Sequence, residues 1–264
     1  MSIRIPKMIV TDLDGTLLRD DKTTSEYTRR VLTRCREIGC KMVYATGRGE
    51  SFAHVAPQEC FDGKITMNGA VAVIDGNAVY NCLIPYELAR PVLMACDRRG
   101  LKAAAELGGM HYANFSVSDE WPDFPGTSDC EVVDFAHHAL GAEKLYMVIK
   151  NPDDAAFIRA HLPKELYLCA TRDGFCMVMH VGATKAKAIA ELARIWGIER
   201  QEIAAFGDDI NDIDMLTYAG IGIAMGNAVD EVKAVADAHC QCNNNDGAAR
   251  WLEQNVLERM NHHV

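Results

Sequence analysis

The chain has 264 residues and a formal net charge of −10, and 49% of the residues are hydrophobic and 24% charged. These values are typical of a globular enzyme that is long enough to bury a large core. The acidic charge argues against a nucleic-acid surface, which needs clustered lysine and arginine, so an anionic substrate would need a local cationic pocket. No apolar run approaches the ~18 residues that span a bilayer, and the sequence starts with Met1 and Ser2 and shows no signal peptide.

The ten cysteines are scattered without a C-x-x-C pair, and most of them lie in apolar surroundings. Such cysteines indicate buried, reduced thiols in a cytoplasmic protein, because disulfides are rare in that compartment. His239-Cys240-Gln241-Cys242 could be imagined as a metal site, but it lacks a second pair of ligands and is better interpreted as the end of a strand. We therefore expect a cytoplasmic protein that binds neither nucleic acid nor membrane.

The first predicted strand ends at two carboxylates. An apolar run over residues 8–10 leads directly to Asp12 and Asp14. On an extended chain their Cα atoms would lie ~7 Å apart on the same side, and Gly15 then lets the backbone turn sharply. Two like charges this close repel each other unless a cation neutralises them or one keeps a proton, and Mg²⁺ suits such a site. For this motif alone, an Asx-type turn at the entrance of a loop is the alternative.

A strand–helix–strand unit follows. Thr23 and Glu26 predict a capping box for a helix that ends at Gly39, and a second strand covers residues 41–45. This spacing indicates a parallel sheet with a right-handed crossover. Thr46 then lies at the carboxyl end of a strand, where ligands bind in open α/β sheets. It could also be the N-cap of the next helix, and both roles can hold because a helix start binds anions.

The middle of the chain mixes helices with strands and carries no motif chemistry. After a hairpin around Asp75-Gly76, it predicts helices over residues 86–99 and 151–162 and strands over residues 101–106, 145–149, 166–170 and 176–181. His137-His138 within this segment is interpreted as a surface or packing pair rather than a ligand pair. We expect this segment to be an inserted α+β domain.

The alternation of strands and helices returns at Gly182. Thr184 is the predicted N-cap of a helix to residue 196, which places Lys185 in the first turn, where the helix dipole disfavours a cation. Such a local conflict is frequent at functional sites, although a solvated lysine is the alternative. A strand over residues 203–206 then runs into a turn rich in carboxylates, G-D-D-I-N-D at Gly207–Asp212.

Polar side chains therefore follow several predicted strands, and in a parallel sheet they would share one edge. They are Asp12, Asp14, Thr46, Lys185, Asp208, Asn211 and Asp212. The set offers carboxylates for a metal, a lysine and a hydroxyl for an oxyanion, and a carboxylate that is free to act as nucleophile. This inventory suits phosphoryl transfer, in which catalysis is mainly positioning and charge neutralisation.

The sequence resembles the haloacid dehalogenase-like (HAD) phosphatases, specifically the Cof-type branch, subclass IIB. Four motifs carry the resemblance in the family's order: D-L-D-G-T-L-L at Asp12–Leu18, A-T-G-R at Ala45–Arg48, Lys185 in G-A-T-K, and G-D-D-I-N-D at Gly207–Asp212. Three further stretches are similar to the branch: Met67-Asn68-Gly69-Ala70, Ala224–Ala228 and Asp246-Gly247. One departure is that Ala186 follows the lysine in place of the usual glycine, which the helix start should tolerate.

The resemblance implies an α/β fold with a Rossmann-like parallel-sheet core, the HAD fold, over residues 1–84 and 181–264. It implies an α+β cap domain inserted at residues 85–180. The implied activity is a Mg²⁺-dependent phosphatase that hydrolyses small phosphomonoesters through an aspartyl-phosphate intermediate. Its partner would be a small phosphorylated metabolite, such as a sugar phosphate, a nucleotide or a phosphorylated cofactor.

The resemblance also implies roles for individual residues. Asp12 would attack phosphorus, and Asp14 would protonate the leaving oxygen and then deprotonate the hydrolytic water. The phosphoryl group would be bound by Thr46, Gly47, Lys185 and Asn211. The Mg²⁺ site would consist of Asp12, the backbone carbonyl of Asp14, Asp208 and, in the outer shell, Asp212.

Three other functions are alternatives to this one. A phosphomutase of the same superfamily uses the same motifs and remains the alternative, and it differs in moving phosphate rather than releasing it. A P-type-ATPase-like phosphotransferase is disfavoured because that group has threonine where Asp14 stands. A non-catalytic phosphometabolite-binding module would be expected to have lost Asp12, Asp14 or Lys185, and all three are present.

Overall fold

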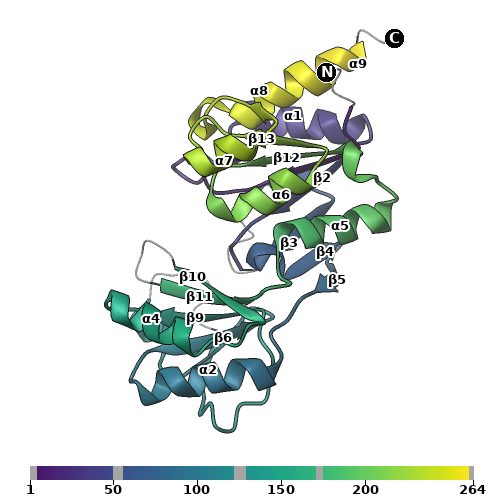
Figure 1. Cartoon of the computed structure of the whole chain (residues 1–264). Coiled ribbons are helices and arrows are strands. Elements are labelled where there is room, and N and C mark those ends of the chain that lie inside the picture. Colours follow the sequence, from purple (N-terminus) through teal and green to yellow (C-terminus); the bar gives the residue numbers. More distant parts are fainter. Residues whose placement is uncertain (1–4, 50–55, 122–128, 171–174, 262–264) are drawn as a thin grey trace. The chain divides into compact units, whose positions relative to one another are not determined.

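The structure is a computed structural model of the whole chain, and it describes residues 5–49, 56–121, 129–170 and 175–261. The chain divides into two compact units (Figure 1). The first comprises Met1–Arg48, Ala53–Tyr80 and Thr184–Val264, and the second comprises Gly49–Phe52 and Asn81–Ala183. The main part of the second unit, Asn81–Ala183, is thus inserted in the sequence between two parts of the first. The α/β fold class with an inserted α+β segment is confirmed.

The first unit contains an eight-stranded sheet in the order β14-β13-β12-β1-β2-β3-β4-β5. The strands run parallel from β14 to β3, and β4 pairs antiparallel with β3, so the sheet is mixed. The strand bounds are β1 Met8–Thr11, β2 Lys41–Ala45, β3 Gly63–Thr66, β4 Val71–Ile74, β5 Asn77–Asn81, β12 Ile203–Gly207, β13 Ile221–Ala224 and β14 Ala238–His239.

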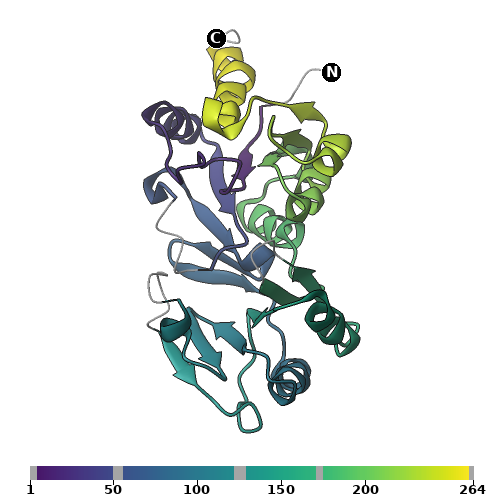
Figure 2. The same cartoon turned by 90° about the vertical axis from the view of Figure 1, so that its left-hand side faces the viewer.

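The central strands are buried along their whole length because helices cover both faces of the sheet. All residues of β1 and β12 are buried, as expected for parallel strands between two helical layers. Figures 1 and 2 show α1 and α8 against one face and α5 and α6 against the other. The helices of this unit are α1 Glu26–Glu37, α5 Lys185–Trp196, α6 Ile213–Tyr218, α7 Asp230–Val235, α8 Gly247–Leu252 and α9 Glu258–Asn261.

The helix that follows the first strand begins differently from the prediction. Ser25, not Thr23, is the N-cap of α1, and its hydroxyl accepts a hydrogen bond of 3.0 Å from the Thr28 amide. The predicted Thr23–Glu26 capping box is therefore wrong. The Thr23 hydroxyl instead donates to the Asp21 carboxylate at 2.7 Å. This local hydrogen bond competes with helix capping by Thr23.

The second unit contains a six-stranded sheet in the order β10-β11-β9-β6-β7-β8. Helices α2 and α4 pack on one face of it and enclose a separate apolar core. The bounds are α2 Tyr86–Arg98, β6 Ala103–Leu107, β7 Met110–Ala113, α3 Val117–Glu120, β8 Cys130–Val132, β9 Lys144–Val148, α4 Pro152–Ala160, β10 Leu166–Ala170 and β11 Phe175–His180. Three short elements, β7, α3 and β8, were not predicted, and they have only three or four residues each.

The paired histidines of the second unit have unrelated surroundings. His137 is exposed and its Nδ1 lies 2.8 Å from an oxygen of Asp134, whereas His138 is buried and packs on the Tyr112 ring. Their interpretation as surface and packing residues is confirmed. Within the part of the chain that the structure describes, no helix has both the length and the apolarity that crossing a membrane requires.

Asp246 ties the C-terminal part of the first unit to the start of α1. Its carboxylate accepts hydrogen bonds from Arg19 at 3.0 and 2.8 Å, from the Ser25 hydroxyl at 2.8 Å and from the Thr28 hydroxyl at 3.1 Å. Burial would raise the pKa of Asp246, but these hydrogen bonds outweigh it and lower the pKa. The charged form of Asp246 therefore stabilises the fold.

Asparagines around Asp246 hold the segment that follows β1. Asn243 Nδ2 donates to the carbonyl oxygen of Leu18 and to the Asp20 carboxylate, both at 3.0 Å. Asn227 Nδ2 donates to the carbonyl oxygen of Gly15 at 2.7 Å, and its Oδ1 accepts from the Asn243 amide at 3.0 Å. Residues close to the C-terminus thus fix the backbone directly after Asp14.

Replacing Asp246 by asparagine should lower the free energy of unfolding by about 1–2 kcal/mol at pH 7, because the charge-assisted hydrogen bonds are lost. Asparagine tolerates the positive φ of 56° at this position, so the backbone should not change. The folded-state pKa is lowered, so the stabilisation is present above the unfolded-state pKa of ~3.9 and is lost as the pH falls through the folded value. The difference should therefore shrink at pH 3, measured by urea denaturation. An equal loss at both pH values would contradict the role of the charge.

Candidate active site

The predicted site residues meet at one edge of the first unit's sheet. Asp12 follows β1, Thr46 follows β2 and Asp208 follows β12, and β1 lies between the other two strands. The Asp12 amide donates to the carbonyl oxygen of Phe206 at 3.0 Å, which fixes the end of β1 against β12. The expected meeting of these strand ends is confirmed.

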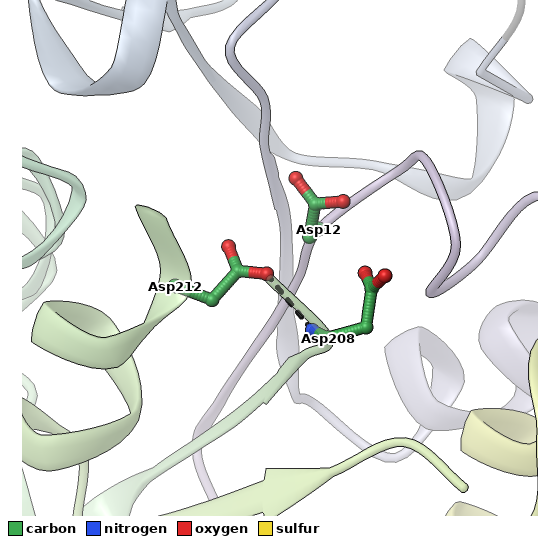
Figure 3. Close-up of side chains that lie close together, drawn as sticks. All are labelled: Asp12, Asp208 and Asp212. Carbon is green, nitrogen blue, oxygen red and sulfur yellow. Dashed lines mark hydrogen bonds between the residues drawn. The ribbon is translucent and has the colours of Figure 1, made fainter. Parts of the chain in front are cut away.

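Three carboxylates converge at this edge. One oxygen from each of Asp12, Asp208 and Asp212 lies within 4.8 Å of the others, and Figure 3 shows the three side chains around a common point. Asp12 is 5% exposed and Asp212 is fully buried. Oxygen ligands at this spacing can hold a hard divalent cation, since Mg²⁺ and Ca²⁺ prefer carboxylates.

Lys185 lies inside this carboxylate cluster. It is 1% exposed, and its Nζ donates to Asp12 Oδ1 and to Asp212 Oδ1, each at 2.6 Å. Burial alone would lower the pKa of Lys185, but the two carboxylates outweigh it and raise the pKa, so the lysine stays charged. The interpretation as a solvated lysine is wrong. Its position in the first turn of α5 is explained because the carboxylates compensate for the unfavourable helix dipole.

The negative charge of the cluster exceeds what one lysine neutralises. Burial raises the pKa of Asp12 well above its usual value although Lys185 opposes the shift. Burial also raises the pKa of Asp208 to about 6, with Asp212 contributing and the hydrogen bond from Thr16 opposing. A second cation at this point would therefore be stabilised by the site.

Backbone amides and a glycine fix two of these carboxylates. Asp212 Oδ2 accepts from the amides of Asp208 at 2.9 Å, drawn in Figure 3, and of Asp209 at 3.1 Å. Gly15 has a φ of 77°, and a Cβ there would lie 2.3 Å from Asp208 Oδ2. Only glycine allows the chain after Asp14 to approach Asp208 this closely.

Asp14 has a separate set of partners. Its carboxylate accepts two hydrogen bonds from the Arg48 guanidinium and one of 2.8 Å from Lys22 Nζ. Burial would raise the pKa of Asp14, but the hydrogen bonds from these two cations outweigh it and lower the pKa. No role was predicted for Arg48 or Lys22. Arg48 could have been found from its place two residues after Thr46, whereas no spacing singles out Lys22.

The remaining predicted residues lie in the loops after β2 and β12. Thr46 is 1% exposed, and its hydroxyl accepts from the Arg48 amide at 3.1 Å. Asn211 is exposed, and its Nδ2 donates to Asn68 Oδ1 at 2.9 Å. A Cβ on Gly47 would lie 3.0 Å from the same Asn68 oxygen. Asn68, for which the sequence predicted no separate role, therefore contacts both loops.

Comparisons with known proteins agree with this geometry. Residues 9–252 match the family model of haloacid dehalogenase-like hydrolases. The chain is 29% identical to the 5-amino-6-(5-phospho-D-ribitylamino)uracil phosphatase YitU of Bacillus subtilis, over 94% of this chain and 97% of the relative.

Solved structures of phosphatases are also similar. A phosphatase of the HAD enzyme superfamily from Bacteroides thetaiotaomicron has a TM-score of 0.79 and 28% identity, with 95% of each chain covered. A HAD subclass IIB sugar phosphatase has a TM-score of 0.78 and 27% identity, with 94% of this chain and 98% of the neighbour covered. The resemblance to the subclass IIB branch, read from the motifs, is thus confirmed.

Replacing Lys185 by methionine should lower the free energy of unfolding by about 3–5 kcal/mol, because Asp12 and Asp212 would then be buried without a cation. Lys187→Met is the matched control, since Lys187 is exposed on the same helix and should change stability by less than about 0.5 kcal/mol. Both values come from urea denaturation in the absence of divalent cations. Equal stability of the two variants would show that the buried ion pairs do not contribute.

Proposed function

The chain belongs to the haloacid dehalogenase-like hydrolases and is a phosphatase of the HAD superfamily, and on this premise we propose that it hydrolyses small phosphomonoesters through an aspartyl-phosphate on Asp12, with Mg²⁺ as cofactor. The observation that carries the proposal is the buried cluster of Asp12, Asp208 and Asp212 around Lys185. This cluster supports the proposal because it combines a buried carboxylate, which could act as nucleophile, with a cation and a candidate metal site.

Asp12 is the proposed nucleophile. Its Oδ1 is held by Lys185, and the backbone on which it stands is fixed between β12 and β2. A carboxylate oxygen would attack phosphorus, forming the aspartyl P–O bond as the bond from phosphorus to the ester oxygen breaks. Lys185 would compensate for the negative charge of the phosphoryl group, and its burial makes this interaction stronger than it would be in water.

Asp14 is the proposed acid and base. It stands two residues after Asp12, and its side chain is 34% exposed, so it can reach a bound ester more readily than the buried carboxylates can. It would donate a proton to the leaving oxygen and then take one from the water that hydrolyses the aspartyl-phosphate. Its ion pairs with Arg48 and Lys22 must loosen before it does so.

The remaining residues supply the phosphate and metal sites of the proposal. Thr46, Gly47, Lys185 and Asn211 would bind the transferring phosphoryl group. Asp12, Asp208 and the Asp14 carbonyl would hold Mg²⁺, whose charge would draw the phosphoryl group and the nucleophile together. Both oxygens of Asp212 already accept hydrogen bonds, which supports its place in the outer shell.

The proposed substrates are small phosphorylated metabolites: sugar phosphates, nucleotides or phosphorylated cofactors. The support is that YitU is named for a phosphorylated ribitylaminouracil and that a similar structure is a sugar phosphatase. We also propose that residues 1–84 and 181–264 form the catalytic core and residues 85–180 a cap domain. The division of the chain near residues 80 and 184 supports these boundaries.

A phosphate-release assay across sugar phosphates, nucleotides and phosphorylated cofactors tests the activity. Release of inorganic phosphate supports the phosphatase, whereas transfer to another position of the same molecule would identify a phosphomutase. The absence of both activities, across the panel and with Mg²⁺ present, would overturn the proposal.

Replacing Asp12 by asparagine should reduce phosphate release by roughly 10⁴-fold or more, because the nucleophile is lost while the shape of the side chain is kept. The matched control is Asp75→Asn, which changes an exposed carboxylate in the turn between β4 and β5 that has no role in the proposal. Steady-state turnover by a folded Asp12→Asn protein at the rate of the control would contradict the assignment of Asp12.

Exhaustive chelation should abolish activity, and Mg²⁺ should restore it far better than Ca²⁺. The buried carboxylates and a phosphoryl group repel each other unless a cation lies among them. Mg²⁺ requires near-octahedral geometry at ~2.0–2.1 Å, whereas Ca²⁺ takes more ligands and would misplace the nucleophile. Initial rates after chelation and metal addition are the measurement, and full activity of the chelated protein would contradict the proposed site.

A further inference from the structure

Met67, Asn68 and Gly69 form a buried turn in which three consecutive residues have positive φ. The values are 51° for Met67, 51° for Asn68 and 99° for Gly69, and the first two residues are 1% and 6% exposed. This backbone region is uncommon for residues other than glycine, although asparagine tolerates it better than most. Strained conformations persist only where the surrounding structure fixes them, and they are frequent at functional sites.

The turn is fixed first by the loop after β2. The Asn68 amide donates to the carbonyl oxygen of Thr46, and the Met67 amide donates to that of Arg48, both at 3.0 Å. The Asn68 side chain packs on Gly47, since a Cβ there would lie 3.0 Å from Asn68 Oδ1 and 3.3 Å from its Nδ2. Asn68 therefore contacts both residues of this loop that the proposed function assigns to phosphate.

The turn also holds the loop after β12. Asn211 Nδ2 donates to Asn68 Oδ1 at 2.9 Å across a separation of 143 residues in the sequence. Because Asn211 is exposed, its side chain would sample several rotamers without a partner. The hydrogen bond from Asn211 to a buried acceptor selects one of them.

The start of α5 is the third segment in contact with the turn. A Cβ on Gly69 would lie 2.2 Å from the carbonyl oxygen of Thr184 and 2.7 Å from the Lys185 amide, so only glycine fits there. The segments before and after the inserted unit are therefore packed together through residues 67–69. Each of the three contacted segments carries a residue of the proposed phosphate site.

From these contacts we propose that Asn68 is a positioning residue of the active site. It fixes the rotamer of Asn211 and the backbone at Thr46 and Gly47. These phosphate-binding residues are therefore already in position before the substrate binds. The inference rests on the proposed function, which gives those three residues this role. The inference adds Asn68 to the proposed phosphate site as a residue that acts through Asn211 and through the loop after β2.

The test removes the side-chain amide of Asn68 without straining the backbone. Asn68→Gly accepts the same φ, and kcat/KM for p-nitrophenyl phosphate should fall about 10- to 100-fold because the phosphate-binding groups lose their arrangement. The change should appear mainly as a higher KM and a higher inhibition constant for inorganic phosphate. If Asn68 acts through Asn211, the double variant Asn68→Gly/Asn211→Ala should lose much less than the product of the two single losses.

Two further measurements distinguish positioning from general destabilisation. Asp75→Gly is the matched control, because Asp75 also has a positive φ of 49° but lies in the exposed turn between β4 and β5, so its kcat/KM should stay within twofold. The side-chain amide signal of Asn211 in a ¹⁵N–¹H spectrum should move in Asn68→Gly. It should stay closer to its wild-type position in Asn68→Asp, which keeps an acceptor oxygen for Asn211.

An Asn68→Gly enzyme within twofold of wild type would overturn the inference, as would fully multiplicative losses in the double variant or an Asn211 signal that does not move. Failure of the proposed function would look different. In that case the wild-type protein itself would release no phosphate from any ester. The side-chain amide signal of Asn211, compared between the wild type and Asn68→Gly, would then be the measurement that tests whether Asn68 fixes Asn211.

Discussion

The structure of the site depends on one buried cation. Lys185 is almost inaccessible to water, and its ammonium group bridges Asp12 and Asp212 at 2.6 Å. Without it, carboxylates from the ends of β1 and β12 would repel each other within a region of low polarity. With it, they can lie side by side while still carrying more negative charge than a single lysine cancels. The fold thus maintains a site that favours a further cation.

This arrangement follows from the order of the strands. Because β1 lies between β12 and β2, the segments after these three strands come together although they are far apart in the sequence. The site is then kept rigid by uncharged groups. Asn68, Asn227 and Asn243 each join two segments through their amide side chains. Amides suit this purpose because they donate and accept hydrogen bonds without adding charge to an already charged site.

Much of the fold and the carboxylate cluster could be predicted from the sequence. Asp12, Asp208 and Asp212 follow apolar runs that are typical of buried strands, and Lys185 was indicated by its unfavourable place at a helix start. Residues that act through tertiary contacts could not be found in this way. Asn68 is distinguished only by a backbone conformation, Lys22 only by its contact with Asp14, and Ser25 replaced Thr23 as N-cap because Asp21 competes for the threonine hydroxyl. The short strands β7 and β8 lack a periodic pattern long enough to recognise.

The hydrogen bonds from Asn227, Asn243 and Asp246 to the segment after β1 have a consequence for biosynthesis. During translation the segment after β1 is made before the residues that fix its backbone, which follow more than 200 positions later. The second unit is almost contiguous in sequence and can fold while the chain is still growing. The first unit can complete its folding only after β12 and the loop around Asp246 have been made. Long-range contacts of this kind also slow folding. A chain that stops before Asn227 would therefore carry a folded insert and an incomplete site, so the site would form only after the loop around Asp246 has been made.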